Sequence, residues 1–246
     1  MTSRTASFDA DEVGRFDALA RQWWDEAGPM KPLHRINAVR VAYLRDVLCA
    51  HFGRDVRSFR PLAGVSILDI GCGGGILSEP LARMGAEVTG VDPAGSNIAV
   101  ARDHAAGGGL AITYRDGLAE DLRAEGRMFD CVLAMEVVEH VPDVAAFVAT
   151  AAGMVRQGGL FAGSTLNRTK RALALAIVGA EYILRWLPVG THRWEKFVTP
   201  GEFAAALADA GLRPGPLRGM VYNPFGESWR LSDDTAVNYF ITATRP

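Results

Sequence analysis

The sequence predicts an α/β fold in which a mostly parallel sheet is covered by helices on both faces. Two observations support this class. Between residues 65 and 164, short apolar runs alternate with segments whose apolar residues recur at helical spacing. A cluster of glycines follows the first apolar run and leads directly into an amphipathic segment. Because consecutive parallel strands need a crossover between them, this alternation favours a doubly wound sheet.

Two helices are expected before the sheet begins. One apolar stripe runs through residues 16–24, and a second runs through residues 36–47, after a break at Gly28-Pro29 and Pro32. Strands and helices then alternate along the chain. The expected strands are 65–70, 87–91, 111–114, 129–134 and 160–164, with helices at 76–84, 96–106 and 144–155 between them.

The last third of the chain departs from this alternation. An insertion spans residues 167–196, and residues 199–202 then read as a capping box with a proline at the first helical position. The helix that starts there should run to about residue 210. We predict seven strands in total, the last two forming a C-terminal antiparallel hairpin from residues 217–222 and 237–242.

Composition and charge exclude several classes of protein. The chain has 246 residues, a formal net charge of −2 and 49% hydrophobic residues, which describes a globular domain without a general attraction for nucleic acid. Its three cysteines include no C-x-x-C pair, so neither a disulfide framework nor a four-cysteine zinc site is expected, and the compartment should be reducing. Residues 1–9 lack the apolar core of a signal peptide, and no apolar run reaches the roughly 20 residues that span a bilayer. We expect a soluble protein, bound at most to a membrane surface.

The strongest functional signal is the run Leu68-Asp69-Ile70-Gly71-Cys72-Gly73-Gly74-Gly75, in which a buried strand ends in glycines and a helix follows. Glycines such as Gly71 and Gly73 allow a sharp turn and let a ligand lie against main-chain N–H groups. Asp92 ends the next strand, 21 residues after Gly71. At that distance a carboxylate reaches both hydroxyls of a ribose beside the turn. The pattern favours a ribose-containing cofactor over a purely structural turn.

Two kinds of cofactor fit this arrangement, a nicotinamide or flavin dinucleotide and S-adenosylmethionine. The dinucleotide fingerprint G-x-G-x-x-G needs a third glycine where Ile76 stands, and the chain has no Tyr-x-x-x-Lys pair. The pattern G-x-G-x-G preceded by Asp69 is instead typical of class I methyltransferases. No G-x-x-x-x-G-K-[ST] loop supports an NTPase. We therefore rank methyl transfer above hydride transfer, with a non-catalytic cofactor-sensing module as a third hypothesis.

A second constellation directly follows the fourth expected strand, at residues 135–142. In a doubly wound sheet this segment lies beyond the carboxyl ends of the strands, where ligands bind. Met135 is expected either to close over the adenosyl group or to belong to the core. Glu136, Glu139 and His140 would share one face if the segment were helical. Three interpretations stay open: His140 is a general base, the trio binds a divalent cation, or the trio only orders the loop.

The chain resembles one known family from nearly end to end. The motifs that carry this resemblance are Trp23-Trp24, Lys31–Asn37, the glycine run, Glu136–Val141, Gly179–Arg185 and Val237–Tyr239. On these motifs the chain is similar to the ubiquinone biosynthesis O-methyltransferases, a Rossmann-like class I family that uses S-adenosylmethionine. This resemblance implies cofactor binding at Arg40, Gly71, Asp92 and Met135. The stretch 49–64 looks longer than usual, which is a departure that leaves the motifs intact.

The resemblance also implies a reaction and a division of the chain. The expected substrates are polyprenylated phenols or catechols, methylated on ring hydroxyls at two steps of the pathway; another small-molecule methyl transfer is the alternative. Residues 61–246 would form the methyltransferase core, preceded by helices in residues 1–60 that contact the cofactor. A phenol, with a pKa of about 10, must lose its proton. His140 could accept that proton, or Mg²⁺ or Zn²⁺ held by Glu136, Glu139 and His140 could lower the phenol pKa.

A polyprenyl substrate would lie in a bilayer, so the insertion at 167–196 is expected to contact both substrate and membrane. Its apolar residues form one helical arc, and basic and acidic residues gather on another, as in an interfacial helix; a core or dimer helix is the alternative. We expect a cytoplasmic enzyme peripherally attached to the inner membrane, with other ubiquinone-pathway enzymes as partners. The arc comprises Leu173, Ala176, Ile177, Ala180, Ile183, Leu184 and Leu187.

Overall fold

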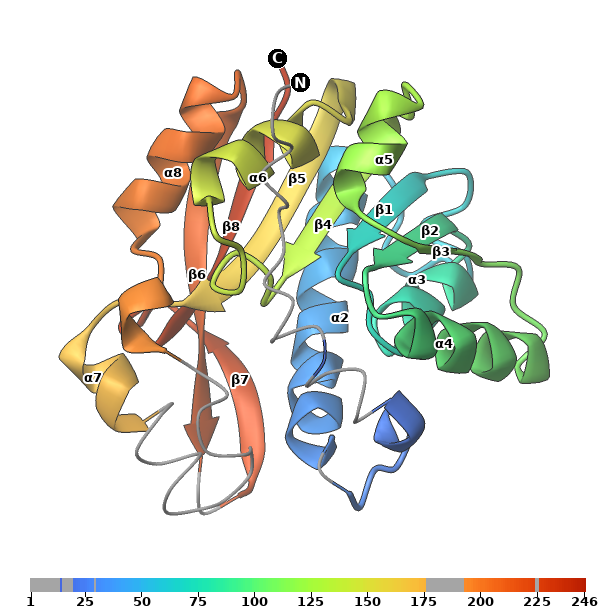
Figure 1. Cartoon of the computed structure of the whole chain (residues 1–246), viewed down its shortest axis with the longest axis horizontal. Helices are drawn as coiled ribbons and strands as arrows, with labels where there is room; N and C mark the ends of the chain where they lie inside the picture. The colour runs from blue at the N-terminus through green and yellow to red at the C-terminus, as the bar shows by residue number, and fades with distance from the viewer. Residues whose placement is uncertain (1–13, 15–19, 29, 176–192, 224–225) are drawn as a thin grey trace.

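The computed structural model describes residues 14, 20–28, 30–175, 193–223 and 226–246 (Figure 1). The described residues form one eight-stranded sheet with the strand order β3-β2-β1-β4-β5-β8-β6-β7. Strands β1 to β5 are parallel, and β8 runs antiparallel between β5 and β6. The strands are β1 (Ser66–Ile70), β2 (Glu87–Asp92), β3 (Thr113–Asp116), β4 (Phe129–Met135), β5 (Val155–Leu166), β6 (Arg213–Asn223), β7 (Ser228–Ser232) and β8 (Asn238–Thr244).

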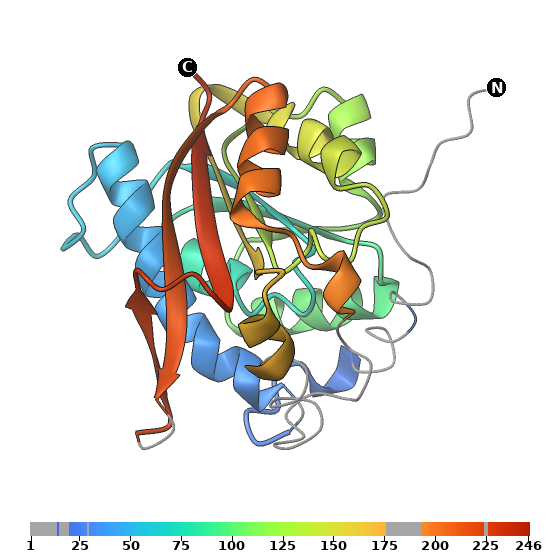
Figure 2. The ribbon, with the colours of Figure 1, turned by 90° about the vertical axis from the view of Figure 1, so that its left-hand side faces the viewer.

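Helices cover both faces of the sheet, as Figure 2 shows in a view turned by 90°. On one face, α2 and α3 bury leucines such as Leu44 and Leu81 against β1, β2 and β4. On the other face, α5, α6 and α8 bury side chains such as Phe147 and Phe203 against β1, β4, β5 and β8. The helical segments are η1 (Ala20–Gln22), α2 (Lys31–His51), α3 (Ser78–Arg83), α4 (Gly95–Gly107), α5 (Ala119–Ala124), α6 (Val144–Ala152), α7 (Lys170–Ala172), η3 (Trp194–Lys196) and α8 (Pro200–Asp209).

The observed order of elements confirms the predicted fold class and most of its strands. The capping box at the start of α8 is also confirmed, because Thr199 Oγ1 accepts from the Glu202 N–H at 3.3 Å and the Glu202 carboxylate accepts from the Thr199 N–H at 2.8 Å. Strand β7 was not expected, so the count of seven strands was one short. The expected antiparallel pair near the C-terminus exists as β6 and β8, but β7 lies between them in sequence and pairs with β6.

Two expectations fall partly outside the described residues. Of the helix expected over residues 16–24, residues 15–19 are not described, and Ala20–Gln22 forms a single 3₁₀ turn. Of the insertion, residues 176–192 are not described. Where it is described, the insertion begins as a helical turn at α7. Within the residues that the structure describes, no helix is long and apolar enough to cross a membrane.

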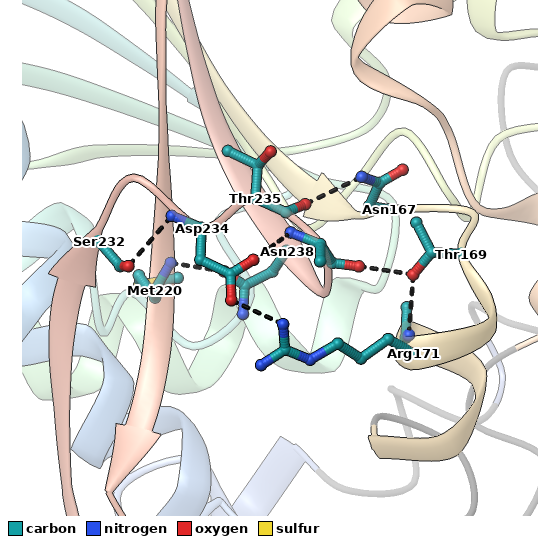
Figure 3. A network of polar contacts seen from close by, with 10 residues as sticks. Asn167, Thr169, Arg171, Met220, Ser232, Asp234, Thr235 and Asn238 are labelled. Carbon is teal, nitrogen blue, oxygen red and sulfur yellow. Dashed lines mark hydrogen bonds and ion pairs between the residues drawn. The ribbon is translucent and has the colours of Figure 1, made fainter.

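The first residues of the insertion are fastened to the loop before β8 (Figure 3). Asn167 donates to the Thr235 carbonyl at 2.9 Å, Thr169 Oγ1 donates to the Ala236 carbonyl at 2.6 Å, and Arg171 pairs with Asp234 at 2.7 Å. The first residues of the insertion, directly after β5, are therefore held in place by bonds to the loop that leads into β8.

Candidate functional site

The glycine turn lies at the carboxyl end of the central strand β1. Gly71 and Gly73 have φ values of +70° and +53°, in the left-handed region that favours glycine. A Cβ at Gly71 would come within 2.7 Å of Val137 Cγ2, which belongs to the segment that follows β4. Because the strand order reverses between β1 and β4, this contact marks the crevice where doubly wound folds bind ligands.

Asp92 closes this turn from the end of β2. Its Oδ2 accepts from the Gly73 N–H at 2.9 Å, and its Oδ1 accepts from the Ala94 N–H at 2.9 Å and from Asn97 Nδ2 at 3.3 Å. Burial raises the pKa of the carboxyl, and the hydrogen bonds from Ala94, Gly73 and Asn97 oppose that rise. The structure thus brings Asp92 and the glycine turn together, as the spacing predicted.

Asp69 supports the glycine turn from the strand that precedes it. It lies in β1 with 2% of its surface exposed, and its Oδ2 accepts from Ser78 Oγ at 2.6 Å. Burial raises its pKa to about 6, against the opposing effects of the Ser78 hydrogen bond and the Arg40 charge. Asp69 therefore links the strand before the turn to the first residue of α3.

Arg40 reaches the same crevice from α2. Only 4% of its surface is exposed, and Nη2 lies 3.5 Å from Glu136 Oε1. Its Nε, also buried, has no hydrogen-bond partner. A buried guanidinium with an unsatisfied donor fits the carboxylate of an amino-acid ligand, because two parallel N–H donors match such a group. The residues at the turn therefore fit S-adenosylmethionine at both its methionyl and ribose ends.

Met135 ends β4, and the segment after it forms a turn, not a helix. Glu136 adopts φ +55°, a strained conformation for a residue with a side chain, while its N–H continues the ladder to the Ser164 carbonyl at 2.9 Å. The condition under which Glu136, Glu139 and His140 would share a helical face is therefore not met. Met135 is buried and takes its place among the core side chains of the α2 face.

The three polar residues of this turn have different surroundings. Glu136 Oε1 accepts from Ser164 Oγ at 2.6 Å. Glu139 is buried and accepts from Thr165 Oγ1 at 2.8 Å, and burial together with the Glu136 charge raises its pKa to about 8. His140 is half-buried at the end of the turn. Among the described residues, no group of three or more His, Cys, Asp or Glu side chains could hold a metal ion, so the metal site stays a prediction.

Some residues at the site were not predicted to contribute to it. The Trp23 ring covers the turn so closely that a Cβ at Gly73 or Gly74 would overlap it. Trp24 Nε1 donates to the Gly74 carbonyl at 3.0 Å, and Asn97 reaches Asp92 from the first turn of α4. The two tryptophans carried part of the family resemblance, but their spacing in sequence gives no sign of contact with the turn. The sequence did not indicate a role for Asn97, because an Asn within a helical segment is usually exposed to solvent.

The comparisons agree with this geometry. Residues 68–163 match the family model described as a methyltransferase domain. Among solved structures, magnesium protoporphyrin IX methyltransferase from Synechocystis PCC 6803, with bound SAH, aligns with a TM-score of 0.66 and 20% identity over 95% of each chain. The plantazolicin methyltransferase BpumL aligns with a TM-score of 0.66 and 14% identity over 96% of each chain. Fold and site together define a class I S-adenosylmethionine-dependent methyltransferase.

Relatives of high sequence identity show which family within this class the chain belongs to. The ubiquinone biosynthesis O-methyltransferase of Methylobacterium nodulans is 60% identical over 98% of this chain and 96% of its own length. The enzyme of the same name from Chelativorans sp. is 52% identical over 99% of this chain and 96% of its own length. The chain belongs to the ubiquinone biosynthesis O-methyltransferases, which excludes the nicotinamide-dependent alternative.

We expect Asp92→Ala to weaken S-adenosylhomocysteine binding by about 2–4 kcal/mol, because two ribose hydroxyls would lose a charged acceptor in a buried site. Isothermal calorimetry measures this change directly. Asp103→Ala, which removes an exposed carboxylate from helix α4, is the matched control and should keep wild-type affinity. Equal affinities for the two variants would remove Asp92 from the cofactor site.

The raised pKa of Asp69 predicts a pH-dependent stability. The folded protein keeps this proton up to about pH 6, whereas the unfolded chain loses it near the ordinary value of 3.8, so the stability contributed by the protonated form is lost as the pH rises between them. Asp69→Asn is neutral throughout. Relative to that variant, the wild-type free energy of unfolding should fall by about 3 kcal/mol across this range, measured by urea unfolding. Parallel pH profiles would contradict the assignment.

Proposed function

We propose that this chain methylates a ring hydroxyl of a polyprenylated phenol or catechol in ubiquinone biosynthesis, at two steps of the pathway. The observation that carries the proposal is full-length identity of 60% to a ubiquinone biosynthesis O-methyltransferase, combined with an intact cofactor turn. Transfer of a labelled methyl group from S-adenosylmethionine to a short-tailed demethylated quinol, detected by mass spectrometry, tests it. Absence of the O-methylated product with a protein that binds S-adenosylhomocysteine would refute it.

The reaction is an in-line displacement in which the ring oxygen forms a bond to the methyl carbon as the carbon–sulfur bond breaks. When bound, the sulfonium of S-adenosylmethionine supplies the electrophile. The chain must align the oxygen and exclude water. A phenol is only about one part in a thousand ionised at pH 7, which is equivalent to roughly 4 kcal/mol, so the chain must also promote loss of its proton.

His140 is the proposed general base. It lies five residues beyond Met135, in the turn that meets the glycine turn through the Val137–Gly71 contact. A neutral imidazole can take a phenol proton as transfer begins. The Glu139 carboxyl beside it in sequence has a raised pKa, so much of it is protonated near neutral pH.

A divalent cation is the alternative means of activating the hydroxyl. Glu136, Glu139 and His140 would supply its ligands, and a catechol could bind it through two oxygens. Two carboxylates and water suit Mg²⁺, whereas the imidazole is more typical of Zn²⁺. In the described structure Glu136 Oε1 and Glu139 Oε2 accept hydrogen bonds from Ser164 and Thr165, whereas the buried Oε1 of Glu139 has no hydrogen-bond partner.

We expect His140→Ala to lower kcat by about 10²–10⁴ while S-adenosylhomocysteine affinity stays nearly unchanged, which is the scale of a general base. Raising the pH should partly restore the rate, since more substrate is then ionised. His51→Ala, at the exposed end of α2, is the matched control and should retain wild-type kcat.

Chelation separates the two mechanisms. If EDTA leaves wild-type activity intact, the general-base role of His140 is supported. If EDTA abolishes activity and Mg²⁺ or Zn²⁺ restores it, the metal interpretation replaces it.

We further propose that the insertion binds a membrane surface and meets the lipid-tailed substrate there. The sequence of the insertion combines the apolar arc with Arg168, Lys170 and Arg171 at its start. It also contains Tyr182 and Trp186, which suit the headgroup region. The described start supports this: Leu173 and Leu175 are 38% and 52% exposed, next to the exposed Arg171. Peripheral attachment to the inner membrane, and contact with other pathway enzymes, belong to the same proposal.

The double variant Ile177→Glu/Leu184→Glu should abolish sedimentation of the protein with anionic liposomes. Added salt should weaken wild-type binding, because each Lys or Arg near the surface contributes about 1 kcal/mol that is screened within a Debye length. The variant should still methylate short-tailed substrates, since the insertion delivers substrate and does not carry out the displacement.

The matched control for this experiment is Val56→Glu/Phe59→Glu, which adds the same charge at two exposed apolar residues after α2. It should keep liposome binding. If only the control variant loses liposome binding, the loop after α2, and not the insertion, contacts the membrane. The membrane proposal fails if the wild type does not bind liposomes and the Ile177→Glu/Leu184→Glu variant unfolds or loses an oligomer. The insertion would then be a core or subunit-contact element.

A further inference from the structure

A buried chain of hydrogen bonds joins the N-terminal segment to Asp92. Trp23 Nε1 donates to Asn97 Oδ1 at 2.7 Å, and Asn97 Nδ2 donates to Asp92 Oδ1 at 3.3 Å. The exposed fractions of the three side chains are 8%, 1% and 8%, so water does not replace these bonds. The three residues come from three separate elements: the turn after η1, helix α4 and the end of β2.

The chemistry of the indole determines the orientation of the amide. An indole N–H can only donate, so the atom of Asn97 that faces Trp23 must be its carbonyl oxygen. The NH₂ group of Asn97 must then face Asp92. Without the indole the amide would lose one of the two hydrogen bonds that hold it in this orientation, and it would be held less firmly against the carboxylate.

The donor matters because the Asp92 carboxyl group is buried. Every partner that the structure gives it is a donor: the main-chain N–H groups of Gly73 and Ala94, and the amide of Asn97. Such donors stabilise the charged form, which burial disfavours. Only the charged form has all its lone pairs available to accept from ribose hydroxyls.

The indole itself is held in place independently of Asn97. His34 Nε2 bonds to the Trp23 carbonyl at 2.8 Å. The neighbouring Trp24 donates to the Gly74 carbonyl and stacks on His104, with ring centroids 3.5 Å apart. The N-terminal segment thus brings a fixed donor to the start of α4.

We propose that Trp23 and Asn97 are positioning residues for the cofactor: Trp23 fixes the Asn97 amide, which orients the Asp92 carboxylate toward the ribose hydroxyls. The inference rests on the assignment of Asp92 to the cofactor site. It gives the N-terminal segment a specific part in cofactor affinity, in addition to its cover over the glycine turn.

A double-mutant cycle on S-adenosylhomocysteine affinity tests this inference. Trp23→Phe keeps an aromatic ring but removes the donor, and Asn97→Ala removes the relay. Each should raise the calorimetric Kd about 5–10-fold. In the Asn97→Ala background, Trp23→Phe should change the Kd less than about 2-fold, because the amide that it orients is gone. Additive effects, or no effect of Trp23→Phe, would overturn the proposal.

Asn97→Asp distinguishes positioning from packing. A packing role predicts that the nearly isosteric Asp is tolerated better than Ala. The positioning role predicts the reverse, because a second carboxylate would face Asp92. A carboxylate also has no orientation to fix, so Trp23→Phe should have little effect in this background, and the cycle can be run there if Asn97→Ala does not fold.

Kinetics and a control complete the test. Trp23→Phe should raise the KM for S-adenosylmethionine and leave kcat near the wild-type value. Trp229→Phe, which changes an indole of β7 packed on Tyr222, should leave the Kd unchanged. If Asp92→Ala weakens binding while Trp23→Phe and both Asn97 variants do not, this inference fails and the proposed function stands. If the wild type does not bind S-adenosylhomocysteine, the proposed function fails as well.

Discussion

The site depends on one buried hydrogen bond, from the Gly73 N–H to the Asp92 carboxylate. It ties the turn after β1 to the end of β2 and so sets the shape of the crevice at the carboxyl edge of the sheet. A carboxylate in this place requires several donors, and the chain supplies them from the turn, from Ala94 and from α4. The glycines are required for a related reason: the turn must approach both Trp23 and Val137 more closely than residues with side chains allow.

Much of the fold could be predicted because its core strands are apolar and short, and their helices follow the 3.6-residue period. Strand β7 was missed because its sequence, SWRLS, has no buried residue and pairs only at the outer edge of the sheet. Helix α5 was missed because its six residues are too short to show a period. Local pattern alone does not encode either element, since each depends on neighbours that are distant in sequence.

In the site too, some features could be predicted from local sequence and others could not. Gly71, Gly73 and Asp92 could be predicted because a fixed spacing along one β-α-β unit brings them together. The condition for a shared helical face of Glu136, Glu139 and His140 is not met, because Glu136 pairs with Ser164 on β5 and takes a left-handed conformation instead of starting a helix. The place of Asn97 could not be predicted either, because its partner Trp23 lies 74 residues away in sequence.

The insertion and the glycine turn are attached to different parts of the sheet. Its first residues are fastened to the loop before β8 and, through Arg168, to Glu202 at the start of α8. The glycine turn belongs to the other half of the sheet, at β1 and β2. On the proposed membrane role, the insertion can therefore be replaced to suit a different lipid tail without changing any hydrogen bond of the glycine turn.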